Sequence, residues 1–198
     1  MSHVLLLEQR NFIRQHLRNL RRSLTEEQQQ RAADMLTERA VSFEGIASAV
    51  HIALFIPVDG EINTLLLSAK FWKQKKQIYL PVLHPFAAGH LLFLSYTPQT
   101  PLVLNKLNIP EPPLDVRQII TLDRLDVMIV PLVAFDNRGQ RLGMGGGFYD
   151  RALQNWRQQG FLPIGVAHDF QKVEKLPVMQ WDIALPVVLT PSQLWQWE

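Results

Sequence analysis

The strongest constraint on the fold of this chain is an almost entirely apolar run, residues 126–135, that leads into a glycine-rich segment. A continuous apolar run is typical of a strand buried on both faces of a sheet. Segment 141–151 reads Arg-Leu-Gly-Met-Gly-Gly-Gly-Phe-Tyr-Asp-Arg, and residues 152–156 carry an amphipathic helix pattern. Glycines between a strand and a helix allow backbone N–H groups to face an anion. The sequence therefore predicts that this segment holds nucleotide phosphates.

Strand and helix patterns alternate along the rest of the chain. Apolar runs predict further strands at 49–56, 77–81, 91–96, 163–168 and 187–190. Periodic patterns predict helices at 9–23, 25–40 and 65–76. The strand at 91–96 follows a turn and is expected to be antiparallel, whereas the proline-rich segment 97–118 is expected to be extended. No repeat and no linker interrupts this order. The sequence predicts one α/β domain over residues 1–198 with a mixed, mostly parallel sheet.

The two N-terminal helices carry clear local signals. In the first, the apolar stripe expected to face the body consists of Ile13, Leu17, Leu20 and Leu24. The second opens at Thr25, and Gln28 stands three residues on, as in a capping box. Its buried side is expected to include Met35, Leu36 and Ala40.

Arginines gather in the first helix, where residues 10–22 contain no acid. The members on the flank of the apolar stripe are Arg10, Arg14, Arg18 and Arg21. Their stems can pack on the body while the guanidinium groups reach an anion. A solvated basic face is the alternative, since charge runs usually have that role. A nucleic-acid-binding surface is disfavoured because no aromatic residues are interleaved with the arginines.

Composition narrows the class of protein. A chain of 198 residues with 47% hydrophobic and 19% charged residues matches a globular domain with a sizeable core. The absence of cysteine excludes a disulfide scaffold, thiolate zinc sites and a cysteine nucleophile. The first residues lack the pattern of a signal peptide. The uncharged stretch 77–105 is broken by prolines, so we expect strands there rather than a membrane span, and a cytoplasmic protein.

The glycine segment fits neither common nucleotide fingerprint. No Gly-Lys-Ser/Thr follows, which excludes a P-loop, and Phe148 stands where the third Rossmann glycine belongs. A flexible turn or a tight packing site remains the alternative. Arg141 adds a cation beside the loop, and Asp150 falls in the first turn of the next helix. That acid either serves the helix dipole or binds Mg²⁺ together with phosphate oxygens.

Three more polar residues are candidates for a role in a site. Glu61 follows the strand at 49–56, and open α/β sheets bind ligands at such strand ends; an ordinary acid near a helix start is the alternative. Asp182 lies among apolar neighbours, so we expect a metal or an arginine as its partner. His168 ends a strand and is interpreted as a structural histidine.

On these residues the chain resembles the bacterial 5-formyltetrahydrofolate cyclo-ligase family, also called 5,10-methenyltetrahydrofolate synthetases. The most specific match is 139–151, which is similar to the family's G-x-R-L-G-x-G-G/K-G-Y-Y-D-R pattern. Shorter matches are 61–64, 109–112, Gln171 with 176–177, and 181–182. The chain departs from the pattern at five positions. Other members have lysine in place of Arg10 and of Gly146, and an aromatic residue in place of Leu107. They have tyrosine in place of Phe148 and histidine in place of Trp181.

The resemblance implies a set of site residues and a fold. It implies that ATP is bound by Arg10, Arg14, Arg141, Leu142, Gly143, Met144, Gly145, Gly146, Gly147, Phe148 and Tyr149. It implies that a reduced folate contacts Ile56 and Glu61, and that Asp150 and Asp182 are associated with Mg²⁺. The implied fold is a Rossmann-like, three-layer α/β/α domain.

The implied reaction is the ATP- and Mg²⁺-dependent cyclisation of 5-formyltetrahydrofolate to 5,10-methenyltetrahydrofolate, with release of ADP and phosphate through a phosphorylated iminium intermediate. Such a reaction needs positioning and charge neutralisation but no protein nucleophile. A sugar-phosphate isomerase or a CoA-transferase-like α/β enzyme is the alternative from another class, and an RNA-binding module is a third. We further expect no nucleic-acid partner, no membrane association and a monomer.

Overall fold

The computed structural model describes residues 3–197. Its helices are α1 (His3–Arg22), α2 (Glu26–Ser42), α3 (Glu44–Ala47), α4 (Leu65–Lys73), α5 (Phe148–Leu153) and α6 (Trp156–Gln159). Its strands are β1 (His51–Ala53), β2 (Gln77–Leu83), β3 (Leu91–Tyr96), β4 (Val103–Leu104), β5 (Pro110–Glu111), β6 (Ile119–Ile120), β7 (Val127–Pro131), β8 (Ala134–Phe135), β9 (Arg141–Leu142), β10 (Leu162–Val166), β11 (Val187–Leu189) and β12 (Leu194–Gln196). Among these residues, no helix has the length and apolarity needed to cross a bilayer.

An eight-stranded sheet forms the centre of the molecule, in the order β12-β11-β10-β7-β1-β2-β3-β6. The five inner strands from β11 to β2 run parallel, and antiparallel strands complete both edges. The chain leaves β1 toward β2 on one side and later returns to place β7 on the other. The order therefore reverses between β1 and β7, and ligands of open α/β sheets bind at such a switch point.

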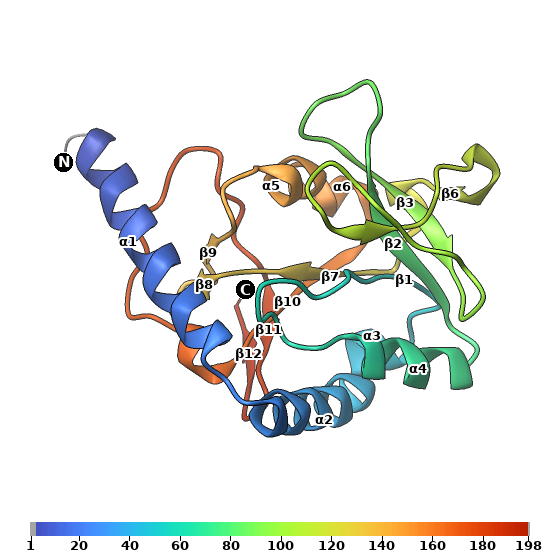
Figure 1. Ribbon diagram of the computed structural model, residues 1–198, viewed down its shortest axis with the longest axis horizontal. Coiled ribbons are helices and arrows are strands. Elements are labelled where there is room, and N and C mark those ends of the chain that lie inside the picture. The colour runs from blue at the N-terminus through green and yellow to red at the C-terminus, as the bar shows by residue number, and fades with distance from the viewer. Residues whose placement is uncertain (1–2, 198) are drawn as a thin grey trace.

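Helices cover both faces of this sheet (Figure 1). On one face α2 and α4 pack on side chains such as Ile52 and Ile129. On the other, Leu153 of α5 packs with an adjacent residue of each strand, Ala53 and Met128. The alternation of the strand side chains between two cores follows from the period of two along a strand. The predictions of an α/β fold, of three layers and of a mostly parallel sheet are confirmed.

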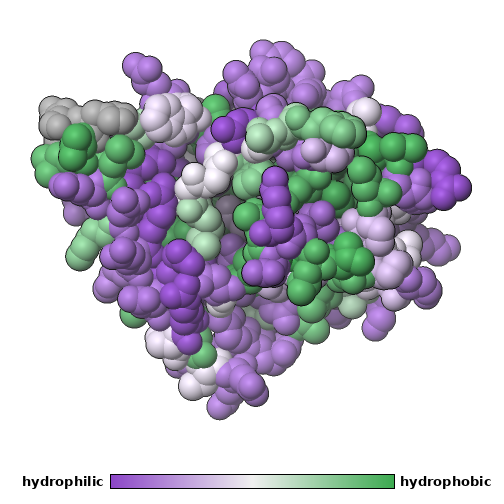
Figure 2. Space-filling view, turned by 45° about the horizontal axis from the view of Figure 1, so that its top comes forward, coloured by the Kyte–Doolittle hydropathy of each residue, from purple (hydrophilic) through white to green (hydrophobic). Residues whose placement is uncertain are grey.

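Helix α1 lies outside these layers, beside β8 and β9 at the left of Figure 1. Its apolar anchor is Leu17, which packs with Val133 and Leu142. The face turned to the body also includes Arg10 and Arg21, both buried. Figure 2 shows an apolar area where α1 begins, and Val4, Leu5 and Phe12 are among the exposed apolar side chains of this helix.

This orientation corrects two expectations about α1. Of the predicted stripe, Leu17 is buried and Ile13 packs against the same cluster, but Leu20 is 38% exposed, so the prediction fails at Leu20. The interpretation of the arginines as a solvated face is wrong for Arg10 and Arg21, because acids and carbonyls of the body accept their hydrogen bonds. An arginine can be buried only where such partners exist, and these partners are remote in the sequence.

The other helix predictions are largely confirmed. Thr25 and Gln28 form the capping box of α2. Leu36 and Ala40 are buried, whereas Met35 is 40% exposed because it lies beside the face that Ala33, Leu36 and Ala40 share. The helix expected over 152–156 is interrupted, since Asn155 leaves helical geometry between α5 and α6.

Two strand predictions need correction. The run 126–135 is not one strand: β7 ends at Pro131, and β8 pairs with β9 in a separate two-stranded ribbon. The break occurs where the Gln171 Nε2 donates to the carbonyls of Leu132 and Val133, at 2.8 and 3.0 Å, in place of a neighbouring strand. The edge beyond 187–190 is formed by β12, which the sequence patterns did not predict.

Candidate active site

The residues singled out from the sequence gather at the switch point of the sheet. The carboxyl end of β1 leads into the turn 58–61, and the carboxyl end of β7 leads through β8 and β9 into the glycine loop, residues 143–147. Helix α1 closes this region, because its side chains contact both the turn and the loop. Three segments far apart in the sequence therefore meet at one edge of the sheet.

The glycine loop presents backbone N–H groups that are free of protein partners. Among residues 3–197, none of the amides of 143–147 donates a hydrogen bond to the protein. Gly145 and Gly147 have φ angles of 104° and 69°, which residues with a Cβ rarely adopt. Arg14 Nε donates to the Gly143 carbonyl at 2.9 Å, and Arg151 Nη1 donates to the Gly146 carbonyl at 3.1 Å. The loop is thus fixed through its carbonyls while its amides stay available.

Arg141 and Asp150 form an ion pair across the base of the loop. The Arg141 side chain is almost completely buried, and its Nε has no hydrogen-bond partner within the described residues. Asp150 lies in the first turn of α5, as predicted, and its carboxylate keeps some exposure. A buried guanidinium with an unpaired N–H can still donate a hydrogen bond to an anion.

Arg10 and Asp182 form a second ion pair, which is buried. Arg10 Nη2 donates to Asp182 Oδ1 at 2.9 Å, Nη1 contacts the other carboxylate oxygen, and Nη1 also donates to the Pro177 carbonyl at 2.8 Å. Of the two partners expected for Asp182, the structure contains the arginine. Arg14 lies between the two pairs, since the charges of Arg10, Asp182 and Asp150 all act on it; its pKa is lowered, first by burial and then by Arg10.

The turn 58–61 is held by the second half of α1. Asp59, in a left-handed conformation with φ of 55°, accepts hydrogen bonds from Arg18 and Arg21 at 2.7 and 2.8 Å and from Arg22. Burial alone would raise the pKa of Asp59, but these bonds lower it to about 2. The sequence offered no local signal for this cluster, because Asp59 lies 37 or more positions from each arginine.

Glu61 faces the interior of the site. Its Oε2 accepts from the Val58 amide at 3.1 Å, and its Oε1 lies 3.8 Å from Arg21 Nη1. Burial raises the pKa of this carboxyl to about 7, against the opposite effect of the amide and of Arg21. The Tyr149 hydroxyl is buried without a partner in the described chain, and its pKa is raised by burial and by the charge of Glu61. Glu61, with a pKa raised to about 7, is thus close enough to the unpaired Tyr149 hydroxyl for its charge to raise the pKa of that group.

His168 and Gln171 support this edge from β10. The His168 ring stacks on Phe170 with centroids 5.4 Å apart, and its Nε2 lies 3.3 Å from the Gly60 carbonyl. Burial lowers the pKa of His168 to about 4, so the ring is neutral at pH 7. Gln171 accepts from the His168 amide at 2.8 Å and binds the end of β7. Both are buried parts of the scaffold, in line with the structural interpretation of His168.

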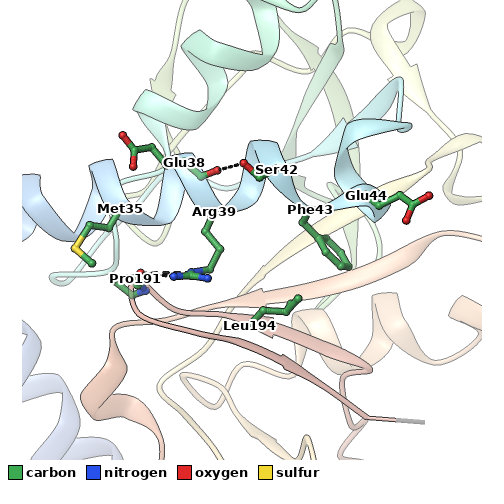
Figure 3. A pocket seen from close by; sticks show the side chains of 8 residues that line it. All are labelled: Met35, Glu38, Arg39, Ser42, Phe43, Glu44, Pro191 and Leu194. Atoms are coloured by element: carbon green, nitrogen blue, oxygen red, sulfur yellow. Dashed lines mark hydrogen bonds between the residues drawn. The ribbon is translucent and has the colours of Figure 1, made fainter.

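The predicted residues thus fall into two clusters of one region. The cluster around the loop contains Arg10, Arg14, Asp182, Asp150 and the segment from Arg141 to Tyr149. Ile56, which is partly buried against the core, and Glu61 follow β1. Arg21 and Asp59, which connect the clusters, were not singled out as a pair by the sequence. Surface pockets occur elsewhere, including one between α2 and the segment 191–194 (Figure 3), and it involves none of these residues.

Known proteins resemble this chain over most of its length. The model of the 5-formyltetrahydrofolate cyclo-ligase family matches residues 7–191. The 5-formyltetrahydrofolate cyclo-ligase of Escherichia coli strain K12 is 55% identical over 181 residues, which cover 91% of this chain and 100% of that protein. The enzyme of the same name from Haemophilus influenzae is 47% identical over 178 residues, covering 90% and 95%.

Solved structures agree with these matches. The Aquifex aeolicus 5,10-methenyltetrahydrofolate synthetase has a TM-score of 0.81 and 28% identity, and the match covers 94% of this chain and 92% of that one. The Mycoplasma pneumoniae protein of that name, with a TM-score of 0.73 and 22% identity, shares the fold over 92% and 98% of the two chains. The resemblance found in the sequence and the predicted class of enzyme are confirmed. This chain belongs to the 5-formyltetrahydrofolate cyclo-ligase family.

Proposed function

We propose that this protein converts 5-formyltetrahydrofolate and ATP into 5,10-methenyltetrahydrofolate, ADP and phosphate. The observation that carries the proposal is the set of unpartnered amides of 143–147 flanked by Arg14 and Arg141, next to the buried Glu61. Amides and guanidinium groups bind phosphate oxygens, and a buried carboxyl such as that of Glu61 can hydrogen-bond the polar atoms of a ligand's ring. Family membership supplies the identity of the substrates.

ATP would bind with its phosphates on the glycine loop. The loop amides have no acceptor within residues 3–197, so an anion would satisfy them without displacing a bond described there. Arg14 is already placed at the loop by its bond to Gly143, and Arg141 Nε is buried and unpaired. Arg10 would contribute positive charge to the phosphates from its position beside Asp182. The remaining loop residues from Leu142 to Phe148 would contribute shape and backbone contacts.

The fit of Mg²⁺ differs between the two acids predicted to accompany it. No group of three potential ligands from His, Asp and Glu occurs within residues 3–197, which suits a cation that prefers one or two carboxylates with phosphate oxygens and water. Asp150 gives one oxygen to Arg141, so its second oxygen would serve the ion. Both oxygens of Asp182 contact Arg10. Asp150 would therefore hold Mg²⁺, which would neutralise phosphate charge, and Asp182 would join it only if Arg10 turned to the phosphates.

The folate would lie on the other side, against Ile56 and Glu61. Glu61 titrates near neutrality, so it can accept a hydrogen bond as a carboxylate or donate one as an acid. The Tyr149 hydroxyl nearby is a second unused donor. Because Tyr149 directly follows the loop and Phe148 in the chain, the two substrates would meet where Tyr149 lies.

In the reaction, the N5-formyl oxygen attacks the γ-phosphorus of ATP and the bond from that phosphorus to the bridging oxygen breaks, so ADP leaves. The formyl carbon is then an iminium carbon that carries a phosphate ester. N10 attacks this carbon and loses its proton, and the carbon–oxygen bond breaks to release phosphate. The arginines and loop amides hold the phosphates in line and offset charge, which are the main tasks in phosphoryl transfer.

The test mixes purified protein with 5-formyltetrahydrofolate, ATP and Mg²⁺ and records the absorbance of the methenyl product together with ADP release. We expect equal amounts of both products, and no signal when either substrate is omitted. Absence of an ATP-dependent chromophore would contradict the proposal. Folate-independent turnover of a sugar phosphate or a CoA ester would instead support the isomerase or transferase alternative.

A further inference from the structure

Arg21 lies where three segments of the proposed site meet. Its side chain is completely buried; Nη2 donates to Asp59 Oδ2 at 2.8 Å, and Nη1 donates to the Leu132 carbonyl at 3.3 Å. Nη1 is 3.8 Å from Glu61 Oε1, and Nη2 is 3.8 Å from Met144 Sδ. One guanidinium therefore touches the turn 58–61, the end of β7 and the glycine loop.

The backbone around Arg21 is packed just as closely. A Cβ at Gly60 would lie 2.7 Å from the Arg21 carbonyl oxygen, so only glycine allows this approach. Gln29 Nε2 donates to the Gly60 carbonyl at 3.1 Å and extends toward the Arg21 carbonyl, at 3.4 Å. The turn and the end of α1 are thus held together, and a movement of one has to be followed by the other.

We propose that Arg21 is a positioning residue that couples the folate subsite at Glu61 to the ATP subsite at the glycine loop, so that each substrate strengthens the binding of the other. This inference rests on the proposed function for the identity of the two ligands. A ligand that orders either Glu61 or Met144 also orders the shared guanidinium. The second ligand then meets a site that is already ordered and loses less conformational entropy on binding. Such coupling is reciprocal by linkage.

Arg22 provides a matched control on the same turn of α1. It too donates to Asp59, but its side chain is half exposed. In the described part of the chain it makes no hydrogen bond or ion pair with Glu61, Leu132 or Met144. Replacing Arg22 therefore weakens the hold on Asp59 without disturbing the connection between the two subsites.

The experiment measures the Kd of a non-hydrolysable ATP analogue with Mg²⁺ by titration calorimetry, with and without saturating 5-formyltetrahydrofolate. We expect the folate to tighten analogue binding by about fivefold or more in the wild type and in Arg22→Lys. In Arg21→Lys, which keeps the charge but loses the forked geometry, the effect should fall below about twofold. Asp59→Asn releases Arg21 from the turn and should lower the coupling as well.

The inference is overturned if the wild type shows no tightening, or if Arg21→Lys retains it. Thermal melting of each variant verifies that it is folded before titration. Failure of the wild type to form the methenyl chromophore would instead contradict the proposed function. A wild type that forms the chromophore while Arg21→Lys keeps its coupling refutes only the role of Arg21.

Discussion

Arg10 and Asp182 lie 172 positions apart in the sequence and form a buried ion pair that joins the first helix to the C-terminal segment. The pair is completed by the Pro177 carbonyl and the Met179 amide, at 2.8 Å each. Because both charges are removed from water, the attraction between them has to offset the cost of their desolvation. The position of α1 over the glycine loop depends on this contact.

Asp182→Ala should lower the free energy of unfolding by about 3–5 kcal/mol, since it leaves the Arg10 cation buried without a carboxylate. The double variant Arg10→Met with Asp182→Ala should recover much of this loss. Urea denaturation without Mg²⁺ and nucleotide measures both, so any change belongs to the ion pair and not to a metal. Wild-type stability in the single variant would contradict this account.

Asp150→Ala should reduce ATP-dependent turnover by about 100-fold, because the variant loses the carboxylate proposed to hold Mg²⁺ at the phosphates. Chelation of Mg²⁺ should abolish turnover of the wild type, and added Mg²⁺ should restore it. Asp115→Ala, which removes a partly exposed acid at the N-cap of a short 3₁₀ turn, is the control and should retain activity. Near-normal turnover of Asp150→Ala at ordinary Mg²⁺ would exclude the metal role.

Arg14→Ala should raise the KM for ATP by about tenfold or more, as expected for the loss of one charge-assisted hydrogen bond. The KM for the folate should change much less, because Arg14 contacts the glycine loop and not the turn 58–61. Steady-state kinetics with each substrate varied in turn gives both values. Arg117→Ala, at an exposed arginine paired with Asp115, controls for the loss of charge. A larger change in the KM for the folate than in the KM for ATP would contradict the assignment of Arg14 to the ATP subsite.

Glu61→Gln should weaken binding of 5-formyltetrahydrofolate while leaving binding of the ATP analogue intact. The amide keeps the shape of the side chain but loses the charge that the folate and Arg21 would meet. Titration calorimetry with each ligand alone separates the two effects. Equal weakening of both ligands would place Glu61 in the shared scaffold and not in the folate subsite.

The pH dependence of stability should also report Glu61. Its pKa rises from 4.5 in the unfolded chain to about 7 in the folded protein, so the native state binds more protons across this window. Stability should therefore fall as pH rises from 4.5 to 7, by up to about 3 kcal/mol, and then level off. The lowered pKa of His168 acts in the opposite direction between about 4 and 6.5.

Comparison with Glu61→Gln isolates this contribution, because the His168 effect is common to both proteins. Urea denaturation at pH 5 and pH 8 gives the free energy of unfolding of both proteins. Relative to the wild type, Glu61→Gln should be more stable at pH 8 than at pH 5. A difference that stays constant would show that Glu61 titrates in the folded protein as it does in the unfolded chain.

Local patterns predicted the elements whose neighbours lie close in the sequence. The capping box of α2, the buried strands and the position of Asp150 at a helix start all depend on spacing within a few residues. The family pattern added the candidate residues around the loop. The alternation of strands and helices predicted the mostly parallel sheet, and the resemblance to the family implied the three layers.

Long-range partners could not be predicted in the same way. The predicted buried face of α1 was right for Leu17 but wrong for Leu20. It also missed the burial of Arg10 and Arg21, whose partners are acids and carbonyls elsewhere in the chain. The end of β7 was missed because Gln171, on a later segment, donates hydrogen bonds to the carbonyls of Leu132 and Val133, which follow the strand. The hydrophobic pattern contains no information on such pairs.

The contact between Arg10 and Asp182 also has a consequence for biosynthesis. Helix α1 is synthesised well before two of its anchors, the Pro177 carbonyl and Asp182, which lie 167 and 172 positions after Arg10. Domains generally fold as units when enough of the chain has emerged. A nascent chain that stops before residue 182 therefore has its basic helix without this acidic partner, and α1 gains its full set of contacts only after residue 182 has been added.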